Sequence, residues 1–75
     1  MMTTPVKLAA GDQIEFRGRT WTVERFDDCS EYPLVQAHNA SIGIAGFAIL
    51  VYQGKRKRQE SVARIGTDGR VVGWI

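Results

Sequence analysis

Apolar and polar side chains alternate along residues 13–17 and again along residues 20–26. Four apolar residues fall on one face of these two runs: Ile14, Phe16, Trp21 and Val23. A period of two is typical of a strand with one buried face, and Gly18 between the runs can adopt the positive φ that a tight turn needs. The pattern predicts a β-hairpin. Phe26 breaks the alternation, so we expect a bulge or the end of the strand near Arg25.

Three further strands are predicted in the second half of the chain. Residues 47–53 form a mostly apolar run rich in β-formers, which suits a strand buried on both faces. Residues 54–57 turn the chain, and residues 58–65 form a strand or a strand that ends in a short 3₁₀ turn. Thr67-Asp68-Gly69 is a hairpin signal, so residues 70–75 form the last strand.

The segment between the two halves has no clear period. Residues 27–33 form a polar loop, and the pattern at 34–38 suits a short strand. Across residues 39–46, Gly43 and Gly46 disfavour a helix by about 1 kcal/mol each. We expect a loop or one irregular helical turn there.

The length of 75 residues allows one domain, which we place at residues 11–75 after a flexible arm at residues 1–10. An apolar share of 44% is that of an ordinary globular protein, so disorder is not expected. The longest apolar stretch, residues 42–52, is too short for a membrane span of roughly 20 residues. Cys29 is the single cysteine, which predicts a reducing, cytoplasmic setting. Because no disulfide can form within the chain, good packing or self-association must stabilise so small a core.

Five or six short strands joined by tight turns predict an all-β or mainly β fold, a small antiparallel barrel or rolled sheet. The pattern Gly11-Asp12-x-Ile14-x-Phe16-x-Gly18-x-x-Trp21-x-Val23 resembles the opening hairpin of SH3-like small β-barrels. The resemblance covers residues 11–23 and implies a module that binds nucleic acid, peptides or partner proteins more readily than a catalyst.

Residues with catalytic chemistry are few. Cys29, His38 and the acids Asp27 and Asp28 are the only candidates for a nucleophile, a base and an orienting carboxylate, and nine residues across a loop is no recognised spacing. Cys29 and His38 are also too few for a structural zinc site. We therefore expect no catalytic residue, no metal and no cofactor.

The charges are segregated although the net charge is only +2. Residues 1–32 carry four basic and six acidic side chains, whereas residues 53–75 carry six basic and two acidic ones. Four of the basic residues are consecutive at 55–58, directly after the apolar run 47–52, so a buried strand leads into concentrated positive charge. Such a patch suits a polyanion.

The sequence therefore predicts a non-catalytic barrel that binds DNA or RNA through a basic hairpin. The candidate nucleic-acid-binding residues are Lys55, Arg56, Lys57, Arg58, Arg64 and Arg70. Whether the last two lie beside the others depends on the register of the final strands. Two aromatic residues are candidates for a stacking or partner surface: Tyr52 and Trp74.

Other functions fit the same pattern. A charged hairpin tip also keeps a small protein soluble and protects a sheet edge from aggregation. A protein-binding accessory, such as a phage- or plasmid-type inhibitor or adaptor, would use exposed apolar residues instead. An enzyme subunit whose site forms at a symmetric oligomer interface is the third alternative.

Overall fold

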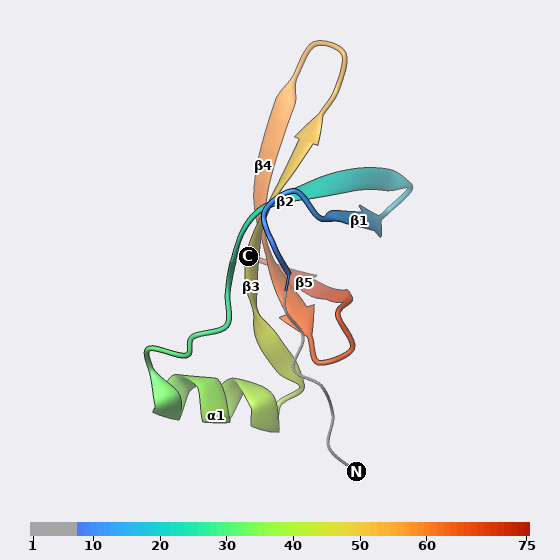
Figure 1. Ribbon diagram of the computed structural model, residues 1–75. Helices are drawn as coiled ribbons and strands as arrows, with labels where there is room; N and C mark the ends of the chain where they lie inside the picture. The colour runs from blue at the N-terminus through green and yellow to red at the C-terminus, as the bar shows by residue number, and fades with distance from the viewer. Residues whose placement is uncertain (1–7) are drawn as a thin grey trace.

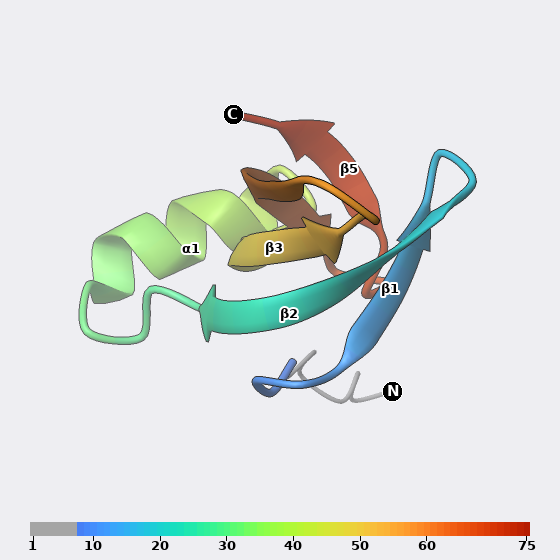
Figure 2. The same cartoon turned by 90° about the horizontal axis from the view of Figure 1, so that it is seen from above.

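Five antiparallel strands form a single sheet in the computed structural model, which describes residues 8–75 (Figure 1). The strands are β1 (Gln13–Phe16), β2 (Arg19–Asp27), β3 (Ile44–Gln53), β4 (Arg58–Gly66) and β5 (Val71–Trp74). Each strand pairs with the next along the chain, so the order in the sheet is β1-β2-β3-β4-β5. The sheet curls into a half-barrel (Figure 2). The prediction of a mainly β, antiparallel rolled sheet is confirmed.

The predicted first hairpin is present, and its turn has only two residues. Phe16 pairs with Arg19 across it. Arg17 and Gly18 have φ values of 53° and 73°, and two positive φ angles are the signature of a type I′ turn. That turn matches the right-handed twist of the strands on either side, which is why a two-residue connection suffices.

The expected bulge in β2 is also present. The register of β2 against β3 shifts between Val23 and Arg25. Because the bulge inserts one residue, Phe26 returns to the face that carries Val23 and packs against the core. The break in alternation at Phe26 is thus a real feature of the strand.

The middle of the chain differs from the prediction. Residues 33–41 form helix α1 (Pro33–Ser41), so the short strand expected at 34–38 is wrong, and β3 begins at Ile44 within the expected loop. Pro33 lies in the first turn of the helix, where its missing N–H is not needed. Gly43, with φ of 80°, follows the helix and marks its end, and Gly46 lies within β3, so neither glycine opposes the helix. Within residues 8–75 no helix is long and apolar enough to cross a membrane.

One face of the sheet, called the inner face below, carries the core. Its buried members come from the three central strands: Trp21, Val23, Ala48, Leu50, Ala63 and Ile65. The opposite, outer face carries the alternate residues, for example Thr22, Val51 and Glu60, which lie side by side on β2, β3 and β4. Leu8 also packs against the core. The other residues of the expected N-terminal arm, 1–7, lie outside the described part of the chain.

Candidate functional site

Four aromatic residues form a continuous row on the inner face, and we call them the aromatic row. The ring centroids of Tyr52 and Trp21 are 5.6 Å apart, those of Trp21 and Trp74 5.3 Å, and those of Trp74 and Phe16 4.9 Å. All three pairs are tilted, within the range that aromatic pairs prefer. The four rings come from β3, β2, β5 and β1, so the curl of the sheet brings them together.

Two arginines lie over this row. The Cζ atom of Arg17 is 5.1 Å from the centroid of Phe16, and that of Arg19 is 4.7 Å from the centroid of Tyr52. Nη1 of Arg19 also donates a hydrogen bond to Oε1 of Gln59 at 2.8 Å. Both arginines remain exposed, so the cation–π contacts hold each guanidinium in place while leaving it open to a ligand.

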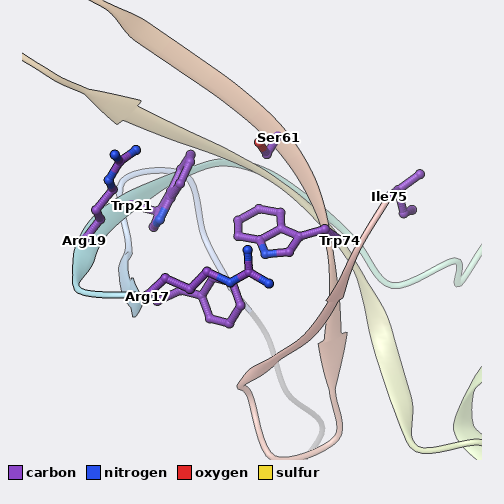
Figure 3. Close-up of a pocket in the computed structure, with 7 residues that line it drawn as sticks. Arg17, Arg19, Trp21, Ser61, Trp74 and Ile75 are labelled. Carbon is purple, nitrogen blue, oxygen red and sulfur yellow. The ribbon is translucent and has the colours of Figure 1, made fainter.

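Two adjoining pockets open over these residues. The larger has a volume of about 540 Å³ and is lined by Phe16, Arg17, Arg19, Trp21, Ser61, Trp74 and Ile75 (Figure 3). The smaller, of about 240 Å³, is lined by Arg19, Tyr52, Gly54, Lys55, Arg56, Lys57 and Gln59. Arg19 belongs to both linings. We call the two pockets together the groove.

The charge in the groove is of one sign. The residues that line it include no Asp or Glu and five with cationic side chains: Arg17, Arg19, Lys55, Arg56 and Lys57. Nearby acids lie on the other side of the sheet, because the alternation that turns Phe16 inward turns Glu15 outward, and Glu60 lies opposite Val51 on the outer face. The sheet therefore separates a positive inner groove from a mixed outer face.

The predicted basic cluster divides between these two faces. Lys55, Arg56 and Lys57 form the turn between β3 and β4 and line the smaller pocket. Arg58 instead forms ion pairs with Glu24 at 3.3 Å and with Glu60 at 2.9 Å. Its charge is thus balanced on the outer face, and it does not belong to the groove.

The β3–β4 hairpin projects beyond its neighbours (Figure 1). The pairing of β3 with β4 continues to Gln53 and Arg58, whereas that of β2 with β3 ends at Thr22 and Val51. The tip of the hairpin therefore extends above the β1–β2 turn as a basic arm, with Tyr52 at its base.

The strand register also places Arg64 and Arg70, the remaining two candidate nucleic-acid-binding residues. In a meander, the β3–β4 and β4–β5 turns lie at opposite ends of β4. Arg64 is six residues from Arg58, about 20 Å along an extended strand, and lies opposite Gly73 on the outer face. Arg70 follows the β4–β5 turn. The structure does not bring Arg64 and Arg70 to the hairpin tip.

Some residues of the groove were not singled out from the sequence. The alternation predicts Phe16 and Trp21 as core residues, and Arg17 and Arg19 stand out only as the neighbours of Gly18 in the turn. The available signal was the position of both arginines around Gly18 in a hairpin turn, since turn residues project from a sheet and carry function more often than core residues do. Both predicted stacking residues, Tyr52 and Trp74, belong to the aromatic row and are partly buried.

Cys29 and His38 lie in different settings. Cys29 is buried in the loop before α1, where Nδ2 of Asn39 contacts its Sγ at 3.8 Å, whereas His38 is exposed on the helix. Burial raises the pKa of the Cys29 thiol, and the carboxylates of Asp27 and Asp28 raise this pKa further. A nucleophilic cysteine needs the opposite shift. Among residues 8–75, no group of three or more His, Cys, Asp or Glu side chains is arranged to hold a metal ion.

The chain was compared with protein-family models, with curated proteins and with solved structures, and none of them matches it. The groove itself is therefore the basis on which a function can be argued.

Proposed function

We propose that this domain binds nucleic acid in the groove between the β1–β2 turn and the β3–β4 hairpin. The observation that carries the proposal is the lining of the groove, which combines five cationic side chains, no Asp or Glu and the four rings of the aromatic row. A polyanion with planar bases matches both components, since phosphates pair with Arg and Lys and bases stack on aromatic faces.

Two further observations support a nucleic acid over a merely solvated tip. A device for solubility needs only exposed charge, yet Arg19 is held by Tyr52 and Gln59 and shares a pocket with the cations of the turn. The rolled five-stranded sheet is also compatible with the SH3-like small β-barrels that the opening hairpin resembles, and such barrels include nucleic-acid-binding modules.

The proposal is tested by fluorescence anisotropy with labelled DNA and RNA strands and duplexes, from low to physiological salt. Affinity is expected to fall linearly with log[salt]. The double variant Lys55→Glu/Arg56→Glu should lose most of this affinity. Its matched control is Arg64→Glu/Arg70→Glu, which changes the net charge by the same amount on residues outside the groove.

The control is expected to lose much less affinity than the groove variant. Equal losses would show that binding follows net charge and not the groove. No binding of the unmodified protein to any of the probes at low salt would refute the proposal.

Binding of a protein partner is the second candidate, favoured by the exposed apolar residues of the helix region. Leu34 is 88% exposed, and three more are well exposed: Tyr32, Val35 and Ile42. Exposed apolar residues grouped on one element mark protein interfaces more often than isolated ones do. A partner recovered from nuclease-treated lysate by the unmodified protein, and lost with Leu34→Glu but retained with the charge variant Lys55→Glu/Arg56→Glu, would support this function.

A further inference from the structure

We infer that the nucleic acid bound in the groove is single-stranded, with an unpaired base in the larger pocket and the backbone along the cations. This inference rests on the proposed function and narrows it to one class of ligand. The pocket beside Trp21 and Trp74, the fixed guanidinium of Arg19 and the arrangement of the basic tip each point to a strand whose bases are free.

The larger pocket has the size and chemistry of a site for a planar ring. Its volume of about 540 Å³ lies within the range of small-molecule sites, roughly 300–1,000 Å³. Phe16, Trp21 and Trp74 supply apolar ring surface, and Ser61 and the two arginines supply polar groups at its edge (Figure 3). In a duplex the bases already stack on each other, so this surface would contribute nothing to binding.

Trp21 shows a second feature of this site. Its indole N–H is buried and, among the described residues, has no hydrogen-bond partner. An unsatisfied buried donor is costly, so such groups are uncommon in folded proteins. Trp74, which packs against Trp21 at 5.3 Å, belongs to a four-residue edge strand near the C-terminus. Because this donor is buried, a base can offer it a carbonyl oxygen or ring nitrogen only when Trp74 shifts to admit the base.

The cations mark the course of the backbone. Arg17 and Arg19 border the pocket for the base, and Lys55, Arg56 and Lys57 border the adjoining one. Arg19 connects them, since it lines both pockets and lies over Tyr52. A strand whose phosphates follow these five cations places a second base near Tyr52. This alternation of rings and cations is what unspecific single-strand binders use.

Insertion of the projecting β3–β4 hairpin into a duplex groove is the competing mode. A two-stranded ribbon fits the major groove of B-DNA. That mode would use Lys55, Arg56 and Lys57 at the tip, and would leave Arg17 and the aromatic row without a role. The hydrogen bond from Arg19 to Gln59 instead ties the base of the hairpin to the pocket, which favours the single-stranded mode.

Three probes of equal length distinguish these modes with the unmodified protein. They are an oligothymidine strand of about 10 nucleotides, an abasic strand of the same length and charge, and the corresponding duplex. We expect the oligothymidine to bind at least about tenfold more tightly than the abasic strand or the duplex, because only it offers free bases. We also expect it, and not the abasic strand, to quench tryptophan fluorescence.

The outcomes separate this inference from the proposed function. Equal affinity for all three probes would overturn the single-stranded mode and leave nucleic-acid binding in place. Tighter binding of the duplex would do the same and would point to insertion of the β3–β4 hairpin into the duplex. No binding to any probe would overturn both.

Variants of Trp74 give an independent reading. Trp74→Leu should lower the affinity for oligothymidine about tenfold and leave that for the abasic strand unchanged, whereas Trp74→Phe should retain most of the affinity. Because Trp74 also packs against the core, circular dichroism must show that each variant is folded. Should Trp74→Leu not fold, the same comparison with Tyr52→Leu tests the second stacking position. Equal losses of affinity for the oligothymidine and for the abasic strand would contradict stacking of a base on Trp74 or Tyr52.

Discussion

The rings of Phe16 and Trp74 lie 4.9 Å apart, although they belong to β1 and β5, the two edge strands of the sheet. No backbone pairing joins these strands among the described residues, so side chains alone bridge the open edge of the half-barrel. The same contact forms one end of the aromatic row. This pair of rings, together with the Trp21–Trp74 contact at 5.3 Å, therefore helps to close the sheet and to shape the groove.

This contact should be measurable as a coupling energy. In a double-mutant cycle with Phe16→Leu and Trp74→Leu, we expect a coupling of about 0.5–1.5 kcal/mol in urea unfolding, the usual value for an aromatic pair. Combining Phe16→Leu with Leu34→Ala on the exposed face of α1 is the control, and these two effects should add. Additive effects for Phe16 and Trp74 would show that the edge contact does not stabilise the fold.

Arg17 combines an unfavourable backbone conformation with a place in the groove. Its φ of 53° is costly for arginine and well tolerated by asparagine, which is common in this turn. Arg17→Asn should therefore raise the free energy of unfolding by a net value of about 0.5 kcal/mol, once the loss of the cation–π contact with Phe16 is subtracted. The same substitution should weaken nucleic-acid binding, because it removes a cation of the groove. Arg19→Asn, at a position without a positive φ, should weaken binding with no gain in stability. A destabilised Arg17→Asn variant would contradict this account.

Gly46 is required by a close approach of two backbone segments. A Cβ at this position would collide with the carbonyl oxygen of Asp27 and would lie 3.0 Å from Cα of Asp28. Backbone cannot move aside as a flexible side chain can, so Gly46→Ala should destabilise the protein by about 1–3 kcal/mol in urea unfolding. At Gly73 a Cβ meets only the side chain of Arg64 at 3.5 Å, so Gly73→Ala should be nearly neutral. Similar effects of the two substitutions would disprove the steric explanation.

Cys29 should react slowly and make stability depend on pH. Burial, with Asp27 and Asp28 nearby, raises the pKa of its thiol in the folded protein, so the native state holds this proton more tightly than the unfolded chain does. The stabilisation is complete below the unfolded pKa and is lost as the pH rises above about 8.5.

Two measurements check the Cys29 prediction. Iodoacetamide should modify the folded protein more slowly than the urea-unfolded protein at the same pH. The difference in unfolding free energy between pH 7 and pH 10 should be smaller for Cys29→Ser than for the unmodified protein. Rapid alkylation of the folded protein would show that the thiol is accessible.

Arg56 and Arg58 are close in sequence and should differ in function. Arg58 is engaged by Glu24 and Glu60, whereas Arg56 lines the groove. We expect Arg56→Gln to lower nucleic-acid affinity and reduce the salt slope by about one, and Arg58→Gln to leave both nearly unchanged. Arg58→Gln should cost at most about 1 kcal/mol of stability, since its ion pairs are exposed. Equal effects on binding would mean that the whole basic run acts as one unit.

Short-range patterns predicted the local structure well where one face is buried. Alternation around Gly18 gave the first hairpin, and the broken period at Phe26 gave the bulge, because both depend on neighbouring residues only. The helix at residues 33–41 was not predicted, because the pattern at 34–38 suits a short strand and Gly43 and Gly46, which follow the helix, disfavour a helix across 39–46. Its apolar residues, such as Leu34 and Val35, are exposed, so no helical pattern of burial indicated it.

The candidate site was predictable only in part. The sequence shows the run at residues 55–58 as concentrated charge and offers Tyr52 and Trp74 as candidate stacking residues. The sequence could not show that Arg58 pairs with acids on the outer face, because that requires the register of β2, β3 and β4. Nor could it show that Arg17 and Arg19 border the same groove as the hairpin tip.

The sequence by itself determined a small, mainly β domain, its turns and one concentration of positive charge, since alternation, turn residues and charge are local properties. The tertiary structure alone decided which cations lie together in the groove. The meander carried Arg64 and Arg70 to the far end of β4, and the curl of the sheet brought Phe16 to Trp74 and placed Arg19 over Tyr52. Strand register and sheet curvature are set by packing across the whole core, so residues distant in sequence form the groove.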